Sequence, residues 1–421
     1  MIELGLSRIT QLIKHTPLNW KAVHVAGTNG KGSITAYISA ILEEAGVVTG
    51  RFNSPHLIDR WDCISIQDDP VSQSVFTQTE DVVKGLNEKL GIRASEFELL
   101  TATAFQVFNH AHVQVGVVEV GLGGRLDATN VLAPKDVLVS VISKIGLDHQ
   151  PLLGHTLTAI AKEKAGIMKE GVPCIVDGTN EPSVLQVLRE QAESERTTLS
   201  IINPETACQT MKLLEPLFRR WKLAPHQQTN LLVAIEALKA AELSLKLTKS
   251  IDESLQVIPR TSWPGRLQTV SLQPLVGQNI TALLDGAHNT QAAEALSIYV
   301  DERIRRQFEP VTWLLAASKG KDVTGLLKCF IKPHDKVIAT RFGPVDGMPW
   351  VEPIDTTHIA QAAKQLSDKV EVTETETVGV ALRCLTTSHL PGPIVITGSL
   401  YLVSDVLRLL RASESSRIQR S

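Results

Sequence analysis

The feature that most constrains the fold is a repeated alternation of short β-branched runs with helical stretches. In the first half of the chain, this alternation runs through KAVHVAG, SITAYISAILEEAG, QVGVVEVG, DVLVSVISKIG and TLTAIAKEKAGIMK. Such a pattern is typical of βαβ units, which build a mostly parallel sheet covered by helices. The strand runs are continuously apolar, as expected for strands that are buried on both faces. We therefore expect an α/β domain with a mostly parallel sheet over residues 1–261.

A second βα series follows the segment TSWPGR. It comprises ITALLDGAHN, VTWLLAASKG, DKVIATRFG and PIVITGS, with intervening helices such as TQAAEALSIYVDERIR. The polar, weakly periodic stretch around 241–262 indicates the approach to a hinge. Because 421 residues exceed what one ordinary core accommodates, we expect a smaller, doubly wound, Rossmann-like α/β domain over residues 262–421.

The charge balance gives no support for a nucleic-acid or membrane partner. Lys and Arg total 42 against 45 Asp and Glu, a net charge of −3, so no global positive field attracts polyanions. Five scattered cysteines with no CxxC pair indicate the reduced thiols of a cytosolic protein. The N-terminal segment carries Glu3 and helical character in place of a targeting signal. A cytoplasmic location is expected, with a mitochondrial pool as the alternative.

A glycine-rich loop, VAGTNGKGS, joins the first predicted strand to the first long helix. It spans Val25–Ser33 and carries three glycines around Lys31. Glycines let backbone N–H groups converge on phosphate oxygens, the helix N-terminus adds its dipole, and Lys31 adds a charge. The loop is a variant of the common pattern, because Val25 occupies the first glycine position and Gly32 follows the lysine. We predict a nucleotide phosphate site; a glycine-rich turn without nucleotide is the alternative.

Phosphoryl transfer requires a divalent cation held by hard oxygen ligands. Glu119 closes a buried strand, where a carboxylate is costly unless it is paired or coordinated, so a metal ligand and an ordinary salt bridge are the two interpretations. His149 lies just past the next strand and is either a ligand of a second cation or a structural histidine. Lys162 and Lys164 flank Glu163 on a predicted helix, and composition alone indicates only solvated charges there.

A series of motifs occurs in order along the chain: GTNGKGS, SPHL, FELLTATAF, EVGLGGRLDATN, GLDHQPLLG, IAKEKAGIMK, HQQTN, WPGRLQ, DGAHN and TGSLYL. With these motifs the chain resembles the folylpolyglutamate synthase and dihydrofolate synthase family of the Mur ligase superfamily, from ELGLSRI to TGSLYL. EVGLGGRLDATN is specific to that family rather than to nucleotide binding in general. The resemblance implies a Mur-ligase-like P-loop ATPase domain, a smaller C-terminal ligase domain, and an ATP-dependent amide-forming ligase.

The resemblance also implies a role for particular residues of these motifs. The implied ATP contacts are Gly30, Lys31, Gly32, Ser33, Asn230, Arg266 and Asp285. The implied magnesium ligands are Ser54, Glu119 and His149. The implied catalytic residues are Lys31, Lys164 and His288. The implied pterin pocket comprises Leu4, Ser95, Phe97, Glu98, Leu126, Asp127 and Ala128.

The lysine that this family carbamylates matches Lys164. A carbamate turns a cation into an anion that can support a second magnesium ion, so the resemblance implies two Mg²⁺ ions, with ATP as co-substrate. The sequence departs from the family pattern at two places. Asp62, Cys63 and Ile64 stand where a Glu-Arg-Ile run is usual, and Ala224 and Pro225 stand where a glycine is common.

The compact length and the segments IDRWDC and VDGMPW resemble the monofunctional dihydrofolate synthases of fungi. The implied reaction joins L-glutamate to 7,8-dihydropteroate, carried out by a monomer whose only partners are small molecules. A folylpolyglutamate synthase or a bifunctional enzyme is the alternative within the class. A P-loop kinase or nucleotide switch would not need a second βα domain with WPGR and DGAHN. A non-catalytic folate-binding descendant would not need Lys31, Glu119, His149 and Lys164.

Overall fold

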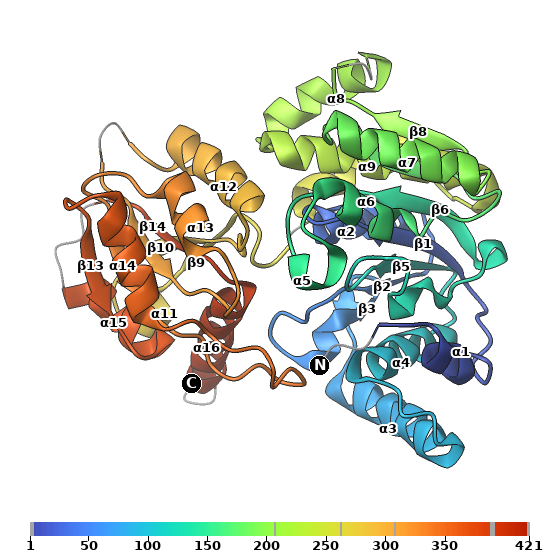
Figure 1. Ribbon diagram of the computed structural model, residues 1–421, viewed down its shortest axis with the longest axis horizontal. Coiled ribbons are helices and arrows are strands. Elements are labelled where there is room, and N and C mark those ends of the chain that lie inside the picture. Colours follow the sequence, from blue (N-terminus) through green and yellow to red (C-terminus); the bar gives the residue numbers. More distant parts are fainter. Residues whose placement is uncertain (1–3, 206–207, 262, 307–308, 388–391, 419–421) are drawn as a thin grey trace. The chain divides into compact units, whose positions relative to one another are not determined.

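The computed structural model describes residues 4–205, 208–261, 263–306, 309–387 and 392–418 (Figure 1). The chain divides into two compact units. One comprises Met1–His56 and Trp61–Ser262, and the other comprises Leu57–Arg60 and Trp263–Ser421. The short segment Leu57–Arg60 thus belongs to the second unit, a feature that a single division near residue 262 does not anticipate. Each unit contains a mostly parallel sheet with helices, which confirms the predicted fold class.

The first unit is built on an eight-stranded sheet with the order β4-β3-β2-β5-β1-β6-β7-β8. In this spatial order, each neighbouring pair along β2-β5-β1-β6-β7-β8 is parallel. At the β2 edge, β3 and β4 add an antiparallel hairpin. The strand order reverses around β1, and in such sheets ligands bind beyond the carboxyl ends of the strands at that point. The strands are β1 (Lys21–Ala26), β2 (Thr49–Phe52), β3 (Ile64–Ile66), β4 (Asp69–Pro70), β5 (Val115–Glu119), β6 (Val137–Ile142), β7 (Cys174–Asp177) and β8 (Leu199–Ile202).

Helices cover both faces of this sheet, so its central strands are buried as the apolar runs predict. Val23 and Val25 of β1 pack into a core cluster with α2 and α9, whereas Ala22 and Ala26 pack into clusters on the opposite face. The helices are α1 (Ser7–Ile13), α2 (Lys31–Glu44), α3 (Gln73–Leu90), α4 (Glu96–His110), α5 (Gln150–Leu153), α6 (Leu157–Ala165), α7 (Pro182–Ser194), α8 (Cys208–Trp221), α9 (Pro225–Ala241) and α10 (Ile251–Ser254). The 3-10 segments are η1 (Arg60–Cys63), η2 (Ala128–Val131), η3 (Pro134–Asp136), η4 (Glu242–Ser244) and η5 (Leu255–Arg260).

The second unit contains a six-stranded sheet with the order β13-β12-β11-β14-β10-β9. Only β9 is antiparallel to its neighbour, and the other described strands pair in parallel. The strands are β9 (Gln268–Ser271), β10 (Thr281–Leu284), β11 (Thr312–Leu315), β12 (Lys336–Ala339), β13 (Glu371–Glu374) and β14 (Ile394–Thr397). The helices are α11 (Gln273–Val276), α12 (Thr290–Arg303), α13 (Val323–Phe330), α14 (Thr356–Leu366), α15 (Val378–Thr387) and α16 (Leu400–Ile418).

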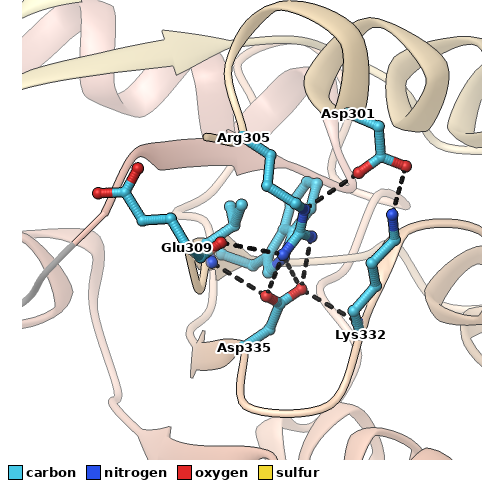
Figure 2. Close-up of polar contacts among 7 residues, drawn as sticks. Asp301, Arg305, Glu309, Lys332 and Asp335 are labelled. Atoms are coloured by element: carbon cyan, nitrogen blue, oxygen red, sulfur yellow. Dashed lines mark hydrogen bonds and ion pairs between the residues drawn. The ribbon is translucent and has the colours of Figure 1, made fainter. Parts of the chain in front are cut away.

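Asp335 anchors the second unit just before β12 (Figure 2). Its buried carboxylate accepts two hydrogen bonds from the Arg305 guanidinium, at 2.6 and 2.9 Å, and one from the Trp313 indole N–H at 2.9 Å. The backbone N–H groups of Val311 and Lys332 complete the set. This cluster lies at the amino ends of β11 and β12, away from the carboxyl ends where ligands collect in such sheets. We therefore interpret it as a structural anchor.

Within the described part of the chain, no helix is long and apolar enough to cross a membrane. Among the described residues, Cys63, Cys174, Cys329 and Cys384 form no disulfide bond, and the side chain of Cys208 lies outside the described side chains.

Candidate active site

The predicted phosphate loop leaves β1 and runs directly into α2. Gly27 and Gly30 have φ angles of 149° and 92°, a backbone region that favours glycine. A Cβ atom on Gly27 would lie 1.7 Å from Ser143 Oγ, and a Cβ atom on Gly30 would lie 2.5 Å from Asn230 Oδ1. Both positions therefore require glycine. The same contact brings Asn230, on α9, against the phosphate loop.

Lys31 begins α2 and lies beside the carboxylate that ends β5. Its Nζ atom is 3.5 Å from Glu119 Oε1, and Asn53 Nδ2 donates to Glu119 Oε2 at 2.6 Å. Glu119 is only 6% exposed, so these partners offset the cost of burying its charge. Gly32 and Ser33 follow in the first turn, where backbone N–H groups have no intrahelical acceptor and are available to an anion. The salt bridge expected as an alternative for Glu119 thus exists, and it lies at the phosphate loop.

Hydrogen bonds join the phosphate loop to the segment that follows β6. The backbone N–H groups of Thr28 and Asn29 both donate to Lys144 O, at 2.9 and 3.1 Å. The Thr28 hydroxyl donates to Gly146 O and accepts from Gly146 N, at 3.1 and 3.0 Å. Asn180 supports the same segment, because its Oδ1 accepts from Ile145 N at 2.8 Å. The conformation of the phosphate loop is therefore coupled to the segment that leads to His149.

Ser54 and Glu119 carry oxygen atoms of the kind that a magnesium ion prefers. Ser54 Oγ is buried and has no hydrogen-bond partner in the structure, so it is available as a ligand. His149 begins the α5 turn, its side chain is 48% exposed, and its Nε2 lies 4.0 Å from Asp148 Oδ2. Among the described residues, no three His, Cys, Asp or Glu side chains gather into a metal-binding group. A magnesium ion here would complete its coordination with phosphate oxygens and water, as this ion commonly does.

Lys164 lies in the protein interior, unlike its neighbour Lys162, which is exposed. Lys164 Nζ donates to Gly27 O at 2.8 Å, so the amine lies beneath the phosphate loop. Burial, followed by repulsion from Lys31, lowers the pKa of Lys164 to about 7. Solvated charge, the simple interpretation from composition, therefore describes Lys162 and is wrong for Lys164. The helix ends at Ala165 with Gly166 as its C-cap, short of the end of the predicted helical stretch, and Gly166 O accepts from Asn130 Nδ2 at 3.0 Å.

Two of the predicted pterin residues form the N-terminal cap of α4. Ser95 Oγ accepts from Glu98 N at 3.3 Å, and Ser95 N donates to Glu98 Oε2 at 2.7 Å. Arg8 Nε, from α1, donates to the same Oε2 atom at 2.8 Å. The other carboxylate oxygen, Glu98 Oε1, is buried and has no hydrogen-bond partner. This carboxylate can therefore still accept a hydrogen bond from a ligand.

The remaining predicted pterin residues surround the loop after Glu119. The Phe97 ring stacks on Phe52, with centroids 6.2 Å apart, and lies so close to Gly121 that a Cβ atom there would approach Phe97 Cζ to 2.4 Å. Asp127 Oδ2 accepts from Leu122 N at 2.7 Å. Two further contacts complete the region: Gly5, next to Leu4, donates its N–H to Leu126 O at 3.2 Å, and Ala128 packs into the cluster that also receives Phe97.

The candidate residues of the second unit lie together just before β9 and just after β10, which are antiparallel neighbours. Asp285 accepts from Leu267 N and Ala287 N, both at 2.9 Å. Arg266 Nη1 donates to Gly265 O at 3.1 Å and lies against Gly286. His288 Nδ1 lies 2.9 Å from Gly286 O, so the Nδ1–H donates in this contact.

Sequence reasoning missed four residues that support this site. Thr28 lies inside the GTNGKGS motif, and Asn53 directly precedes Ser54 of the SPHL motif. Their closeness to these motifs could therefore have indicated a role for both residues. Asn180 follows β7 in the segment DGTN, and Arg8 lies on α1, but no motif singles out either residue. Their roles depend on contacts between distant segments.

Comparisons with known proteins agree along nearly the whole chain. The profile of a family described as dihydrofolate synthetase, C-terminal domain, matches residues 268–409. A probable dihydrofolate synthetase of Schizosaccharomyces pombe is 39% identical over 97% of this chain and 99% of its own length. The dihydrofolate synthetase of Saccharomyces cerevisiae is 36% identical over 97% and 98%, whereas the probable folylpolyglutamate synthase of the same yeast is 27% identical over 96% and 96%.

Solved structures give the same result. E. coli FolC in complex with DHPP and ADP superimposes with a TM-score of 0.77 at 25% identity, covering 98% of this chain and 94% of that one. A bifunctional folylpolyglutamate synthase/dihydrofolate synthase with Mn, AMPPNP and L-glutamate bound has a TM-score of 0.77 at 27% identity, with 98% and 95% coverage.

Proposed function

Because this chain belongs to the dihydrofolate synthase and folylpolyglutamate synthase family, we propose that it ligates L-glutamate to 7,8-dihydropteroate. The reaction consumes ATP and yields dihydrofolate, ADP and phosphate, a step of folate biosynthesis. The observation that carries this choice of substrate is the whole-chain similarity to two fungal dihydrofolate synthetases. The lower identity to a yeast folylpolyglutamate synthase makes extension of reduced folates the second candidate within the class.

The reaction has two steps, both consistent with an acyl-phosphate intermediate. A carboxylate oxygen of dihydropteroate attacks the γ-phosphorus of ATP, the bond to the bridging oxygen breaks, and ADP leaves. The glutamate amine then attacks the acyl carbon, the bond from that carbon to the phosphate oxygen breaks, and the amide, phosphate and a proton are released. Exclusion of water protects the mixed anhydride between these steps.

We assign the first step to residues at the end of β1. Lys31 and the backbone N–H groups of Gly30, Gly32 and Ser33 would hold the phosphates, and the Lys31 ammonium would offset charge on the transferred phosphoryl group. Ser54 and Glu119 would hold Mg²⁺, which when bound neutralises charge on the phosphate oxygens. The unpartnered Ser54 hydroxyl and the buried Glu119 carboxylate support this assignment.

Lys164 and His149 are assigned to a second cation. A neutral lysine amine is the form that reacts with carbon dioxide, and burial favours that form at Lys164. The resulting carbamate would place an anion beneath the phosphate loop, within the region that also contains Lys31. His149 would supply a nitrogen ligand.

The other substrates are assigned by the motifs of the family. Asn230, Arg266 and Asp285 would contact ATP, and His288 would act near the reacting groups. Leu4, Ser95, Phe97, Glu98, Leu126, Asp127 and Ala128 would form the pterin pocket. We propose that the enzyme is a cytoplasmic monomer whose partners are small molecules alone, with a mitochondrial pool as the alternative.

Product masses test the proposed function. Purified protein is incubated with ATP and glutamate, together with either dihydropteroate or tetrahydrofolate. Conversion of dihydropteroate to a product heavier by one glutamate supports the proposal, whereas conversion of tetrahydrofolate alone establishes the second candidate. With ¹⁸O in the substrate carboxylate, one label should appear in inorganic phosphate. Label in AMP instead would overturn the acyl-phosphate step.

A further inference from the structure

His24 is a buried histidine at the centre of β1, and none of the assigned roles uses it. Its side chain is fully buried, on the face of the sheet opposite Val23 and Val25. A neutral imidazole carries one N–H donor and one acceptor nitrogen, and burying either without a partner has a cost. The orientation of this ring therefore requires a physical reason.

The contacts of Thr129 determine which ring nitrogen carries the proton. Thr129 Oγ1 lies 2.6 Å from Asp127 Oδ1, and His24 Nε2 lies 2.9 Å from the same hydroxyl. Burial raises the pKa of Asp127, and the hydrogen bonds that it accepts from the backbone N–H groups of Thr129 and Leu122, at 3.0 and 2.7 Å, oppose that rise and favour the ionised form. An ionised carboxylate only accepts, so Thr129 donates its single hydroxyl hydrogen to Asp127. His24 Nε2 must then carry a hydrogen and donate it to Thr129.

The other side of the imidazole agrees with this tautomer. His24 Nδ1 has no hydrogen-bond partner, and an unpartnered acceptor is tolerated more readily than an unpartnered N–H donor. Ser140, the neighbour of His24 on β6, donates its hydroxyl to Ile167 O at 3.1 Å and so does not serve the ring. Burial and the nearby Lys169 ammonium lower the pKa of His24 to about 3, which keeps the ring neutral.

The hydrogen-bond chain ends at the loop that carries the proposed pterin pocket. Asp127 is 1% exposed, and its Oδ2 atom holds the N–H of Leu122. Gly121, the preceding residue, lies directly against the Phe97 ring. Displacing Asp127 would therefore move the Gly121–Leu122 backbone, which packs against Phe97 and follows the proposed magnesium ligand Glu119 by two and three residues.

We propose that His24 is a positioning residue for pterin binding. Its Nε2–H holds the Thr129 hydroxyl on Asp127, and Asp127 in turn holds the Gly121–Leu122 backbone against Phe97. His24 does not contact the substrate, and its effect is transmitted through Thr129 and Asp127. This inference rests on the proposed function, because it names the residue that organises the pocket assigned to dihydropteroate.

The first test compares His24→Leu with His24→Gln in steady-state kinetics. Leucine removes the donor, whereas the glutamine amide can return an N–H to the position of Nε2. His24→Leu should raise the KM for dihydropteroate about tenfold, as expected for one lost hydrogen bond with a buried partner. The KM for ATP should change less than about twofold, and His24→Gln should recover most of the loss.

The second test uses Thr129, in case His24→Leu does not fold. Thr129→Val removes the hydroxyl with little change of shape, whereas Thr129→Ser keeps it, so only the valine variant should raise the KM for dihydropteroate. The double variant His24→Leu with Thr129→Val should be little worse than the poorer single variant, because both act through one chain of contacts. Val139→Ala on β6, a buried position on the opposite face, controls for general loss of packing.

Each outcome decides the inference. It is overturned if the two KM values rise together, if His24→Gln is no better than His24→Leu, or if Thr129→Val and Thr129→Ser behave alike. A wild-type protein that does not ligate glutamate to dihydropteroate would instead refute the proposed function. The two failures are therefore distinguishable in the same set of measurements.

Discussion

Replacement of Lys164 by Ala should reduce ligation far more than replacement of Lys162 by Ala. The two residues lie on the same helix, yet only Lys164 is buried and bonded to the phosphate loop. With a pKa of about 7, roughly 90% of the Lys164 amine is neutral at pH 8, compared with about 0.3% for an amine at the ordinary value of 10.5. The site therefore increases the reactive form about three-hundredfold.

The expected magnitude follows from the position of the group. An anion that helps hold a cation against the transferred phosphoryl group contributes as much as a preorganised electrostatic donor, about 10²- to 10³-fold in kcat. Lys164→Ala should lose about that factor, whereas Lys162→Ala should stay within about twofold of wild type. In wild type, the neutral fraction of Lys164 falls about tenfold between pH 8 and pH 6, so activity should decline in the same direction.

Activity and intact mass provide the assay. Both variants are compared with wild type at saturating ATP, dihydropteroate and glutamate, with circular dichroism as the control for folding. Wild type and Lys162→Ala measured in bicarbonate should gain the mass of one carbon dioxide, which Lys164→Ala should lack. Equal activity of the two variants, with no added mass on wild type, would refute the assignment of Lys164.

Four further predictions follow from individual contacts. Lys31→Ala should abolish product formation in the ligation assay, because the Lys31 ammonium is the side chain proposed to offset charge on the transferred phosphoryl group. Near-normal turnover would contradict the phosphate-loop assignment. Glu119→Ala should lose magnesium-dependent turnover while its circular dichroism spectrum is unchanged; survival at ordinary magnesium would make Glu119 structural. Asp335→Ala should lower the free energy of unfolding by about 3 kcal/mol or more, measured in urea, since it leaves Arg305 with Asp301 as its carboxylate partner and removes the acceptor of the buried Trp313 N–H. A loss below about 1 kcal/mol would contradict the anchor. The pKa of His24 is lower in the folded chain than in the unfolded chain, so the contribution of neutral His24 to the free energy of unfolding is complete above pH 6.5 and is lost as pH falls toward 3. Between pH 7.5 and 5, the free energy of unfolding of wild type should fall by about 2 kcal/mol more than that of His24→Leu. Equal losses in the two proteins would contradict the burial argument.

The sheet architecture could be predicted because it depends on local order. Continuous apolar strands separated by helices leave few arrangements besides parallel sheets, and both sheets follow that expectation. The segment Leu57–Arg60 could not be assigned in the same way. Arg408 Nη2 donates to Ile58 O at 2.9 Å, a contact between residues far apart in sequence. No period or turn signal in IDRWDC indicates that pairing.

The same distinction applies to the candidate site: local sequence predicts some of its residues, whereas others depend on contacts between distant segments. Gly27, Gly30 and Lys31 follow from the chemistry of a strand, a loop and a helix in succession. Lys164 does not, because the sequence places it beside Lys162 with equivalent composition, and only the turn of α6 buries one and exposes the other. His24 was missed for a related reason. In KAVHVAG it is one polar residue within a buried strand, and its partner Thr129 lies more than a hundred residues away.

Two carboxylates with similar predicted roles show what the contacts add to a motif. Glu98 and Asp127 both fall in segments assigned to pterin binding, and both are almost fully buried. Asp127 accepts hydrogen bonds from its own neighbouring backbone at both oxygens, so it shapes the loop and has little remaining capacity for a ligand. Glu98 shares one oxygen between Ser95 N and Arg8, and its other oxygen is unpartnered. Since an unpartnered buried acceptor is costly unless a ligand satisfies it, we propose that Glu98 accepts an N–H from the pterin and that Asp127 positions the proposed pocket.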